Sequence, residues 1–161
     1  MRIDKAGGAA IRKARLGDVT EIQELVNDFA ARDQMLPKSL SVLYENIRDF
    51  YVAEDSGGRL LGCCAVHVCW ADLVEIKSLA VRDECQGMGL GSALVTACVG
   101  DCRDLGIERV FALTYKVPFF EVLGFRRVEK NTLPQKIWSE CINCPKFPDC
   151  GEEAVVLDLG I

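Results

Sequence analysis

Three glycines at positions 87, 89 and 91 stand directly before an apolar, helix-forming run in the segment DECQGMGLGSALV, residues 83–95. Glycine costs about 1 kcal/mol in a helix interior, so this placement needs a reason. The start of a helix exposes unpaired N–H groups, and glycines there let a phosphate approach the backbone. The segment therefore predicts an anion-binding loop. A tight structural turn is the alternative, and the spacing matches neither a P-loop nor G-x-G-x-x-G.

Strand and helix patterns alternate around this loop. LVEIKSLAV (73–81) and RVFALT (109–114) flank the glycine loop and its helix, which predicts two parallel strands joined by a right-handed crossover. Upstream, the apolar spacing predicts the order strand, helix, helix, strand, strand, with a capping box at Asp18 and Glu21 before the first helix. AVVLDL (154–159) is expected to form the last strand. We expect one α/β domain over residues 1–161.

Charge and cysteine content narrow the class of protein. The net charge of −5 argues against a nucleic-acid-binding protein, and no apolar stretch is long enough to span a bilayer. The chain has nine cysteines, an odd number, so they cannot all pair within the molecule. Five of them lie in apolar runs and are expected to be reduced core thiols of a cytoplasmic protein: Cys63, Cys64, Cys69, Cys98 and Cys102.

The segments Gln86-Gly87-Met88-Gly89-Leu90-Gly91, EIKSLAV and PFFEVLGF carry a family resemblance. In order and spacing they resemble the acetyl-CoA site of the GNAT N-acetyltransferase superfamily, whose signature is Gln/Arg-x-x-Gly-x-Gly/Ala. The resemblance implies an α/β GNAT fold, with a mixed central sheet splayed at the acetyl-CoA site and helices on both faces. It also implies acetyl-CoA as the acetyl donor, with no metal required.

The same resemblance implies which residues bind the coenzyme. Backbone N–H groups of the glycine loop would hold the pyrophosphate, the end of the preceding strand would offer its backbone to the pantetheine arm, and two aromatic residues would flank the thioester. These residues are, in that order, Gln86, Gly87, Met88, Gly89, Leu90, Gly91 and Ser92; Leu79, Ala80 and Val81; and Phe119 and Phe120.

Chemistry is expected on the strand 73–81. Alternation places Leu73, Glu75, Lys77, Leu79 and Val81 on one face. By the resemblance Glu75 is the general base that takes a proton from the amine, although a solvated Glu75–Lys77 pair is the alternative. The backbone N–H of Leu79 is the expected donor to the oxygen that becomes negative. Phe120 stands where many GNAT enzymes have a tyrosine acid, so the expected proton donor is either water, because a thiol with pKa near 8.5 is a tolerable leaving group, or Tyr115 as a substitute.

A finer resemblance is to stand-alone amino-acid N-acetyltransferases, in particular N-acetylglutamate synthases of arginine biosynthesis. It is carried by segments that include IRKARLGDV, LPKSLSVLYENIRDFYVAE and TLPQKIW. Glutamate presents two carboxylates, so cations and hydrogen-bond donors in those segments are candidate ligands, each of which is otherwise an ordinary surface group. They are Arg12, Lys38, Ser39, Lys77 and Lys136. Relatives of this type imply a homodimer.

Other interpretations stay open. Cys141, Cys144 and Cys150 have the spacing of three metal ligands but lack a fourth nearby, so they are equally read as free thiols or as one disulfide. His67 is expected to be a core or pocket-wall residue. A GNAT transferase for a polyamine, an antibiotic or a protein terminus is one alternative function, and a non-catalytic acetyl-CoA or metal sensor is another.

Overall fold

The computed structural model describes residues 4–6, 8–133 and 152–160. Its elements are β1 (Asp4–Ala6), β2 (Ala9–Lys13), α1 (Val19–Ala31), α2 (Leu40–Glu45), β3 (Phe50–Glu54), β4 (Leu60–Trp70), β5 (Leu73–Val81), α3 (Leu90–Leu105), β6 (Arg109–Thr114), α4 (Val117–Val122), β7 (Arg126–Val128) and β8 (Glu153–Asp158). Short 3-10 turns η1 (Leu16–Asp18), η2 (Ile47–Asp49), η3 (Asp83–Cys85) and η4 (Lys130–Thr132) lie between them.

The strands form an eight-stranded sheet in the order β1-β2-β3-β4-β5-β6-β8-β7. Neighbours are antiparallel except β5 and β6, which are parallel and are joined by α3. The predicted crossover is therefore confirmed, and the strands predicted over 73–81 and 109–114 have those bounds. The structure adds the short strands β1 and β7 to the predicted set.

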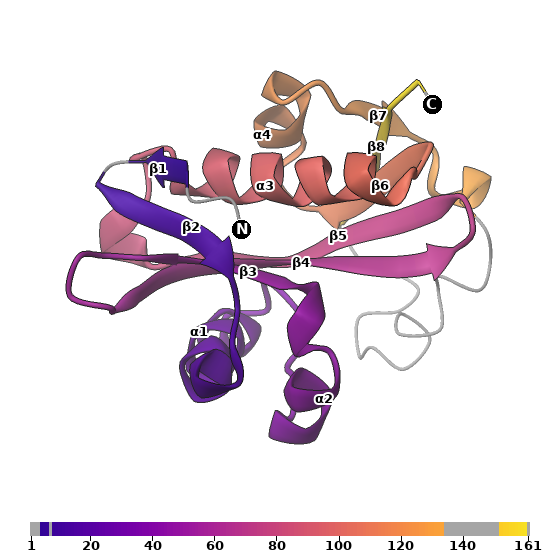
Figure 1. Ribbon diagram of the computed structural model, residues 1–161. Coiled ribbons are helices and arrows are strands. Elements are labelled where there is room, and N and C mark those ends of the chain that lie inside the picture. Colours follow the sequence, from indigo (N-terminus) through magenta and orange to yellow (C-terminus); the bar gives the residue numbers. More distant parts are fainter. Residues whose placement is uncertain (1–3, 7, 134–151, 161) are drawn as a thin grey trace.

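Helices cover both faces of the sheet, as the GNAT resemblance implied (Figure 1). Helices α3 and α4 lie on one face, and α1 and α2 lie on the other. Each face has its own apolar core: Val74 and Ile76 of β5 belong to the α3 side, whereas Ala65 of β4 and Ala80 of β5 belong to the α1 side. Residues that alternate along a strand thus enter different cores.

Helix α1 begins in a different way from the predicted capping box. Asp18 is the N-cap residue, but its side chain makes no cap hydrogen bond, and the Glu21 carboxylate accepts instead from the backbone N–H of Leu60 at 3.3 Å. The Asp18 carboxylate accepts hydrogen bonds from Arg12. The local spacing is that of a capping box, but Arg12 and the backbone N–H of Arg15 occupy the Asp18 carboxylate, and β4 supplies the partner of Glu21.

The cysteines predicted to be core thiols are free in the structure. Cys63, Cys64, Cys98 and Cys102 are buried and Cys69 is half-buried. Burial raises the pKa of Cys63, and it raises the pKa of Cys102 to about 12, so these thiols stay protonated at neutral pH. Cys141, Cys144 and Cys150 lie outside the described residues.

Candidate active site

A cavity of about 860 Å³ opens where β5 and β6 separate. The two strands pair only over Leu73–Glu75 and Arg109–Phe111, while β6 goes on pairing with β8 as far as Thr114. Glu75 is therefore the last residue of β5 that pairs with β6 and lies at the apex of the opening. The splayed sheet implied by the resemblance is present. The cavity is lined from α1, the segment that follows it, β5, the glycine loop, the end of β6 and α4.

A β-bulge in β5 reshapes this strand at the cavity. The β4–β5 register shifts between Cys63↔Ala80 and Ala65↔Lys77, so Ser78 and Leu79 together oppose a single residue of β4. Ser78 has φ +56, which is a left-handed conformation rare for a residue with a side chain. Its carbonyl accepts a hydrogen bond from the Cys63 thiol at 3.4 Å. Such strain commonly marks a functional site.

The bulge overturns the prediction that one face of the strand carries residues 73, 75, 77, 79 and 81. Before the bulge, Val74 and Ile76 enter the core on the α3 side, so Glu75 and Lys77 face the α1 side. After it, Leu79 and Val81 pack on the α3 side. The extra residue shifts the alternation by one position, and Glu75 and Leu79 therefore belong to opposite faces.

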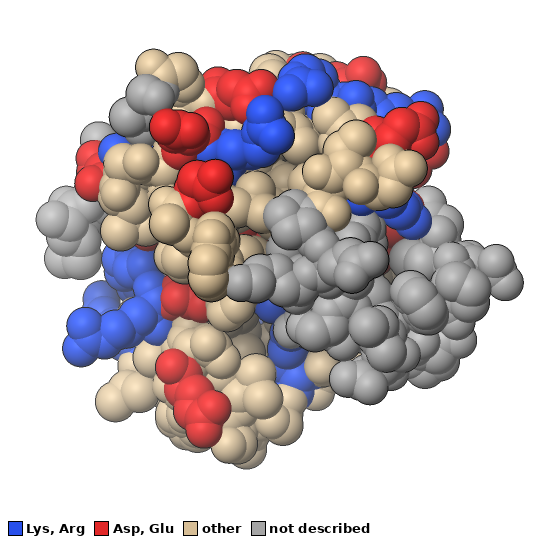
Figure 2. All heavy atoms as spheres, turned by 90° about the vertical axis from the view of Figure 1, so that its right-hand side faces the viewer, with Lys and Arg blue, Asp and Glu red and all other residues tan. Residues whose placement is uncertain are grey.

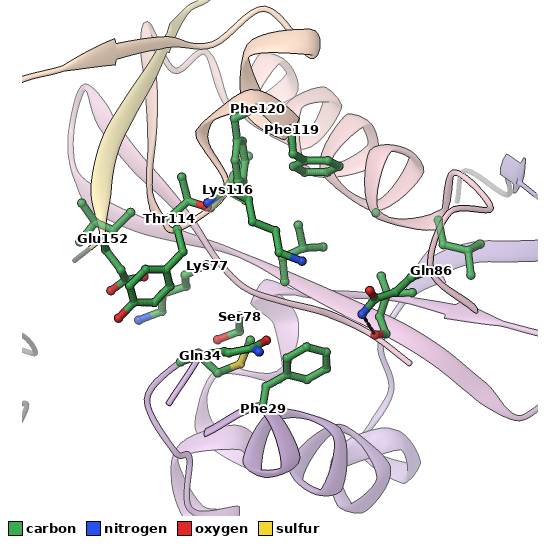
Figure 3. Close-up of a pocket in the computed structure, with 18 of the residues that line it drawn as sticks. Phe29, Gln34, Lys77, Ser78, Gln86, Thr114, Lys116, Phe119, Phe120 and Glu152 are labelled. Atoms are coloured by element: carbon green, nitrogen blue, oxygen red, sulfur yellow. Dashed lines mark hydrogen bonds between the residues drawn. The ribbon is translucent and has the colours of Figure 1, made fainter. Parts of the chain in front are cut away.

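The glycine loop forms an open backbone cradle before α3. Gly87 and Gly89 have φ +83 and +84, and Gly89 is the N-cap of α3. A Cβ at either position would meet nothing within 4 Å, so the space beside the backbone is empty. Gln86 Nε2 donates to the Val81 carbonyl at 3.1 Å and ties the loop to the end of β5 (Figure 3). Free N–H groups at the first turn of a 16-residue helix suit a phosphate.

Most of the predicted coenzyme-binding residues line the cavity. They are Leu79, Val81, Gln86, Gly87, Gly89, Leu90, Gly91, Ser92, Phe119 and Phe120. Two predicted residues do not: Ala80 is buried on the α1 side, and Met88 lies 45% exposed on the outside of the loop. The resemblance assigns only the backbone of Ala80 and Met88 to the coenzyme, and not their side chains. The groups present therefore fit acetyl-CoA, with the glycine loop at one end of the cavity and an aromatic wall beside it.

Helix α4 supplies that aromatic wall. Phe119 and Phe120 pack edge to face with centroids 5.1 Å apart, and a Cβ on Gly91 of α3 would lie 3.4 Å from Phe119. Neither ring can donate a proton to a leaving thiolate. Tyr115, just before α4, does line the cavity, and so do Thr114 and Lys116, which the sequence analysis did not name. The backbone N–H of Lys116 donates to Thr114 Oγ1 at 2.8 Å.

The other end of the cavity collects charged and polar side chains. Lys38 and Lys77, both predicted substrate ligands, line the cavity, and so do Glu75, Gln34 and Glu152. Figure 3 shows Lys77 and Glu152 at the end opposite Gln86, and it shows the Lys116 side chain extending into the space between them. Gln34 and Glu152 were missed because neither belongs to a motif. The sequence offers only one indication of their role, which is their position: Gln34 follows α1, and Glu152 precedes β8.

Three other predicted ligands are placed elsewhere or are not described. Arg12 does not line the cavity. Ser39 is the N-cap of α2, where its hydroxyl accepts from the backbone N–H of Val42 at 3.2 Å, and it does not line the cavity either. Lys136 lies outside the described residues.

Arg12, on β2, instead forms ion pairs with carboxylates of η1 and β3. It is 6% exposed and donates to Asp18 at 2.7 and 3.0 Å and to Glu54 at 2.9 Å. These carboxylates raise the pKa of Arg12 still further. Burial by itself would raise the pKa of Asp18, but hydrogen bonds from Arg12 and from the backbone of Arg15 outweigh it and lower that pKa. The structure therefore gives Arg12 two internal carboxylate partners and does not place it at the cavity with the other predicted ligands Lys38 and Lys77.

Within the described part of the chain, no cluster of three or more His, Cys, Asp or Glu residues is arranged to hold a metal ion. In the same residues, no helix combines the length and hydrophobicity needed to cross a membrane. On the face shown in Figure 2, acidic and basic side chains lie side by side along the upper edge and form no extended basic patch there.

Comparison with known proteins agrees with this geometry. The model of the acetyltransferase (GNAT) family matches residues 18–125. The chain is 40% identical over 154 residues to an uncharacterized N-acetyltransferase of Chlorobaculum tepidum, covering 96% of this chain and 99% of that one. It is 39% identical over 132 residues to the amino-acid acetyltransferase of Mycobacterium tuberculosis, covering 81% of this chain and 75% of that protein.

Two solved structures extend the comparison. A Mycobacterium tuberculosis protein in complex with CoA superposes with a TM-score of 0.80 and 35% identity, over 92% of this chain and 98% of the other. N-acetylglutamate synthase from Neisseria gonorrhoeae, complexed with coenzyme A and N-acetyl-glutamate, gives a TM-score of 0.85 and 28% identity. The match covers 95% of this chain but only 35% of the synthase.

Proposed function

This chain belongs to the GNAT acetyltransferase family and is an acyltransferase, and from that premise we propose that it moves acetyl from acetyl-CoA to the α-amine of L-glutamate. One observation carries the proposal. A single cavity is lined by the open glycine cradle before α3, by Glu75 and by the lysines Lys38 and Lys77. Relatives that are named amino-acid acetyltransferase support an amino-acid acceptor, and the gonococcal synthase complex supports glutamate.

The coenzyme would enter with its pyrophosphate on the N–H groups of residues 86–92. The backbone of residues 79–81 has no β6 partner among the described strand pairs, so the pantetheine arm can take its place as a short extra strand. Phe119 and Phe120 would then flank the thioester, in a part of the cavity where apolar rings exclude water. The coenzyme supplies the activated acetyl group.

Glu75 is the proposed general base. A free α-amine is mostly protonated at neutral pH and has no lone pair for attack until it loses a proton. Glu75 lines the cavity at the apex of the splay, so an amine bound there would transfer its proton to the Glu75 carboxylate, directly or through one water. The backbone N–H of Leu79, on the strand that the thioester follows, would donate to the oxygen that becomes negative.

The acceptor's carboxylates would meet the lysines. Lys38 precedes α2 and Lys77 lies on β5, so cations reach the cavity from two different elements. An amine held between such cations and Glu75 must carry negative charge elsewhere, which favours an acidic amino acid over a polyamine. Tyr115 is the proposed proton donor to the departing thiolate, whose free pKa near 8.5 makes it a tolerable leaving group.

The test is thiol release from acetyl-CoA with a panel of amines: glutamate, glutamine, aspartate, a polyamine and a peptide with a free terminus. We expect turnover that depends on glutamate and that falls by about 100-fold or more in Glu75→Gln, with CoA affinity unchanged. Turnover confined to cationic amines would refute the choice of acceptor. CoA binding without turnover on any amine would refute the enzymatic assignment of this site.

The proton donor needs its own variant, Tyr115→Phe. Loss of the hydroxyl should lower kcat while leaving the KM for glutamate unchanged, because a proton donor to the thiolate acts only as the C–S bond breaks. An unchanged kcat would assign that proton to water.

A further inference from the structure

The only histidine of the chain lies directly across from the proposed base. His67 on β4 is paired with Glu75 on β5, in the regular stretch between the register shifts at Cys63/Ala65 and Val68/Trp70. Directly opposed residues of an antiparallel pair point to the same face, with Cβ atoms about 5 Å apart. The imidazole and the carboxylate are therefore neighbours on the face of the sheet that carries α1 and α2.

An aspartate orients this imidazole. His67 Nδ1 lies 3.1 Å from Asp49 Oδ2, and Asp49 belongs to the η2 turn that leads into β3. A carboxylate accepts, so Nδ1 carries the proton and Nε2 keeps the lone pair. The side chains of His67 and Asp49 are 41% and 29% exposed, so water reaches the ring. The arrangement runs from the cavity to solvent in three side chains: Glu75, His67 and Asp49.

Acetylation of an ammonium substrate requires a route by which a proton leaves the site for solvent. The reaction converts an ammonium and a thioester into an amide and a thiol and releases one proton to solvent. Tyr115 gives its proton to the sulfur as the C–S bond breaks, and the second proton, which leaves the nitrogen after the C–N bond forms, restores the Tyr115 hydroxyl. Glu75 faces a cavity that the coenzyme and acceptor would fill, so the proton it accepts needs a path that avoids the bound substrates.

We propose that His67 is the proton exit of the site. This inference rests on the proposed function. Nε2 of the neutral imidazole takes the proton from the Glu75 carboxyl group, which returns to the carboxylate form. The resulting imidazolium is stabilised by the Asp49 carboxylate and gives its proton to water. His67 touches no substrate atom and acts through Glu75, so it is a positioning and relay residue.

The charged groups around His67 agree with this role. Among the described residues, Asp49 contacts the ring, and Glu75 and Lys77 share its face on the neighbouring strand. Glu75 and Asp49 therefore place a carboxylate on either side of the ring, one to give the proton and one to hold the imidazole in place. The alternative is a purely structural His67–Asp49 link that holds η2 against β4.

Kinetics of His67→Gln in the full chain separate the two roles. We expect kcat at neutral pH to fall by about 100-fold, with the KM for glutamate and the affinity for CoA within two-fold of wild type. In His67→Ala, added imidazole should restore much of the activity, because the site is half exposed. Imidazole should not restore Glu75→Gln, which lacks the first proton acceptor. Asp49→Asn should show a smaller loss than His67→Gln.

A readout without turnover completes the test. Because the chain has a single histidine, NMR reports its imidazole without overlap. The chemical shifts of that imidazole should change in Glu75→Gln, because the residue directly opposite it on β5 has changed.

A kcat within two-fold of wild type in His67→Gln, a loss that imidazole does not restore, or imidazole chemical shifts that are unchanged in Glu75→Gln would overturn the relay. A wild-type chain that turns over no amine would overturn the proposed function instead.

Discussion

Gly89 gives the most discriminating test of the phosphate cradle, because the same helix carries a matched control. Gly89 begins α3 with φ +84, and Gly106 ends it with φ +77. A Cβ at either position meets nothing within 4 Å. Replacement by alanine therefore produces the same backbone strain at both ends, about 1–2 kcal/mol for a left-handed conformation, with no clash. The two positions are about 26 Å apart along the helix.

The strain predicts equal losses of stability. A domain of this size loses about 2–4 °C of Tm per kcal/mol, so Gly89→Ala and Gly106→Ala should each lower Tm by about 2–8 °C in calorimetry without ligand. Only Gly89 lies in the proposed cradle, where a methyl group would occupy the space that phosphate oxygens need. Loss of one charge-assisted hydrogen bond is worth about 1.5 kcal/mol, or about tenfold in Kd.

Titration calorimetry with CoA reads out the difference. We expect Gly89→Ala to weaken CoA binding by about tenfold or more and Gly106→Ala to leave it within two-fold of wild type. A Kd for Gly89→Ala within two-fold of wild type would refute the assignment of the glycine loop to the pyrophosphate. A similar loss of CoA affinity in both variants would show that the strain of α3, and not the cradle, controls affinity.

Three further predictions concern the charged residues. Arg12→Met should lower the free energy of unfolding by about 3–5 kcal/mol in urea, because Asp18 and Glu54 lose their buried partner, while CoA affinity of the folded protein stays unchanged; a loss under 1 kcal/mol would contradict this. The pKa of Asp18 is lowered in the folded state, so its contribution to stability is complete above the unfolded pKa of about 4 and is lost as pH falls further. Asp18→Asn should therefore flatten the acid part of a plot of unfolding free energy against pH. An unchanged slope there would count against this prediction. Lys38→Met and Lys77→Met should each raise the KM for glutamate by about tenfold with a smaller effect on kcat, because a carboxylate contact present throughout the reaction contributes to uniform binding; steady-state kinetics that show normal KM values in both would remove the lysines from the acceptor site.

The glycine loop and its neighbours were predictable because each depends on short-range chemistry. The strand at 73–81, the positive-φ glycines before α3 and the strand at 109–114 follow from residue preferences over a few positions. The acetyl-CoA assignment came from the resemblance carried by those same segments. A loop of this kind binds through its backbone, so its residue types alone indicate its role.

The acceptor end of the cavity was less predictable because it is assembled from elements distant in sequence. Arg12 has the residue type of a carboxylate ligand, yet Asp18 and Glu54 occupy its guanidinium. Gln34 and Glu152 belong to no motif and reach the cavity only after the chain has folded.

The sequence by itself determined the order of the longer strands and helices, the position of the glycine loop before a helix and the identity of the one carboxylate on the splayed strand. Only the tertiary structure decided that the bulge at Ser78 separates the faces of Glu75 and Leu79, and that His67 lies opposite Glu75. The reason is that local conformation depends on neighbours along the chain, whereas strand register and the face a side chain occupies depend on packing between distant segments.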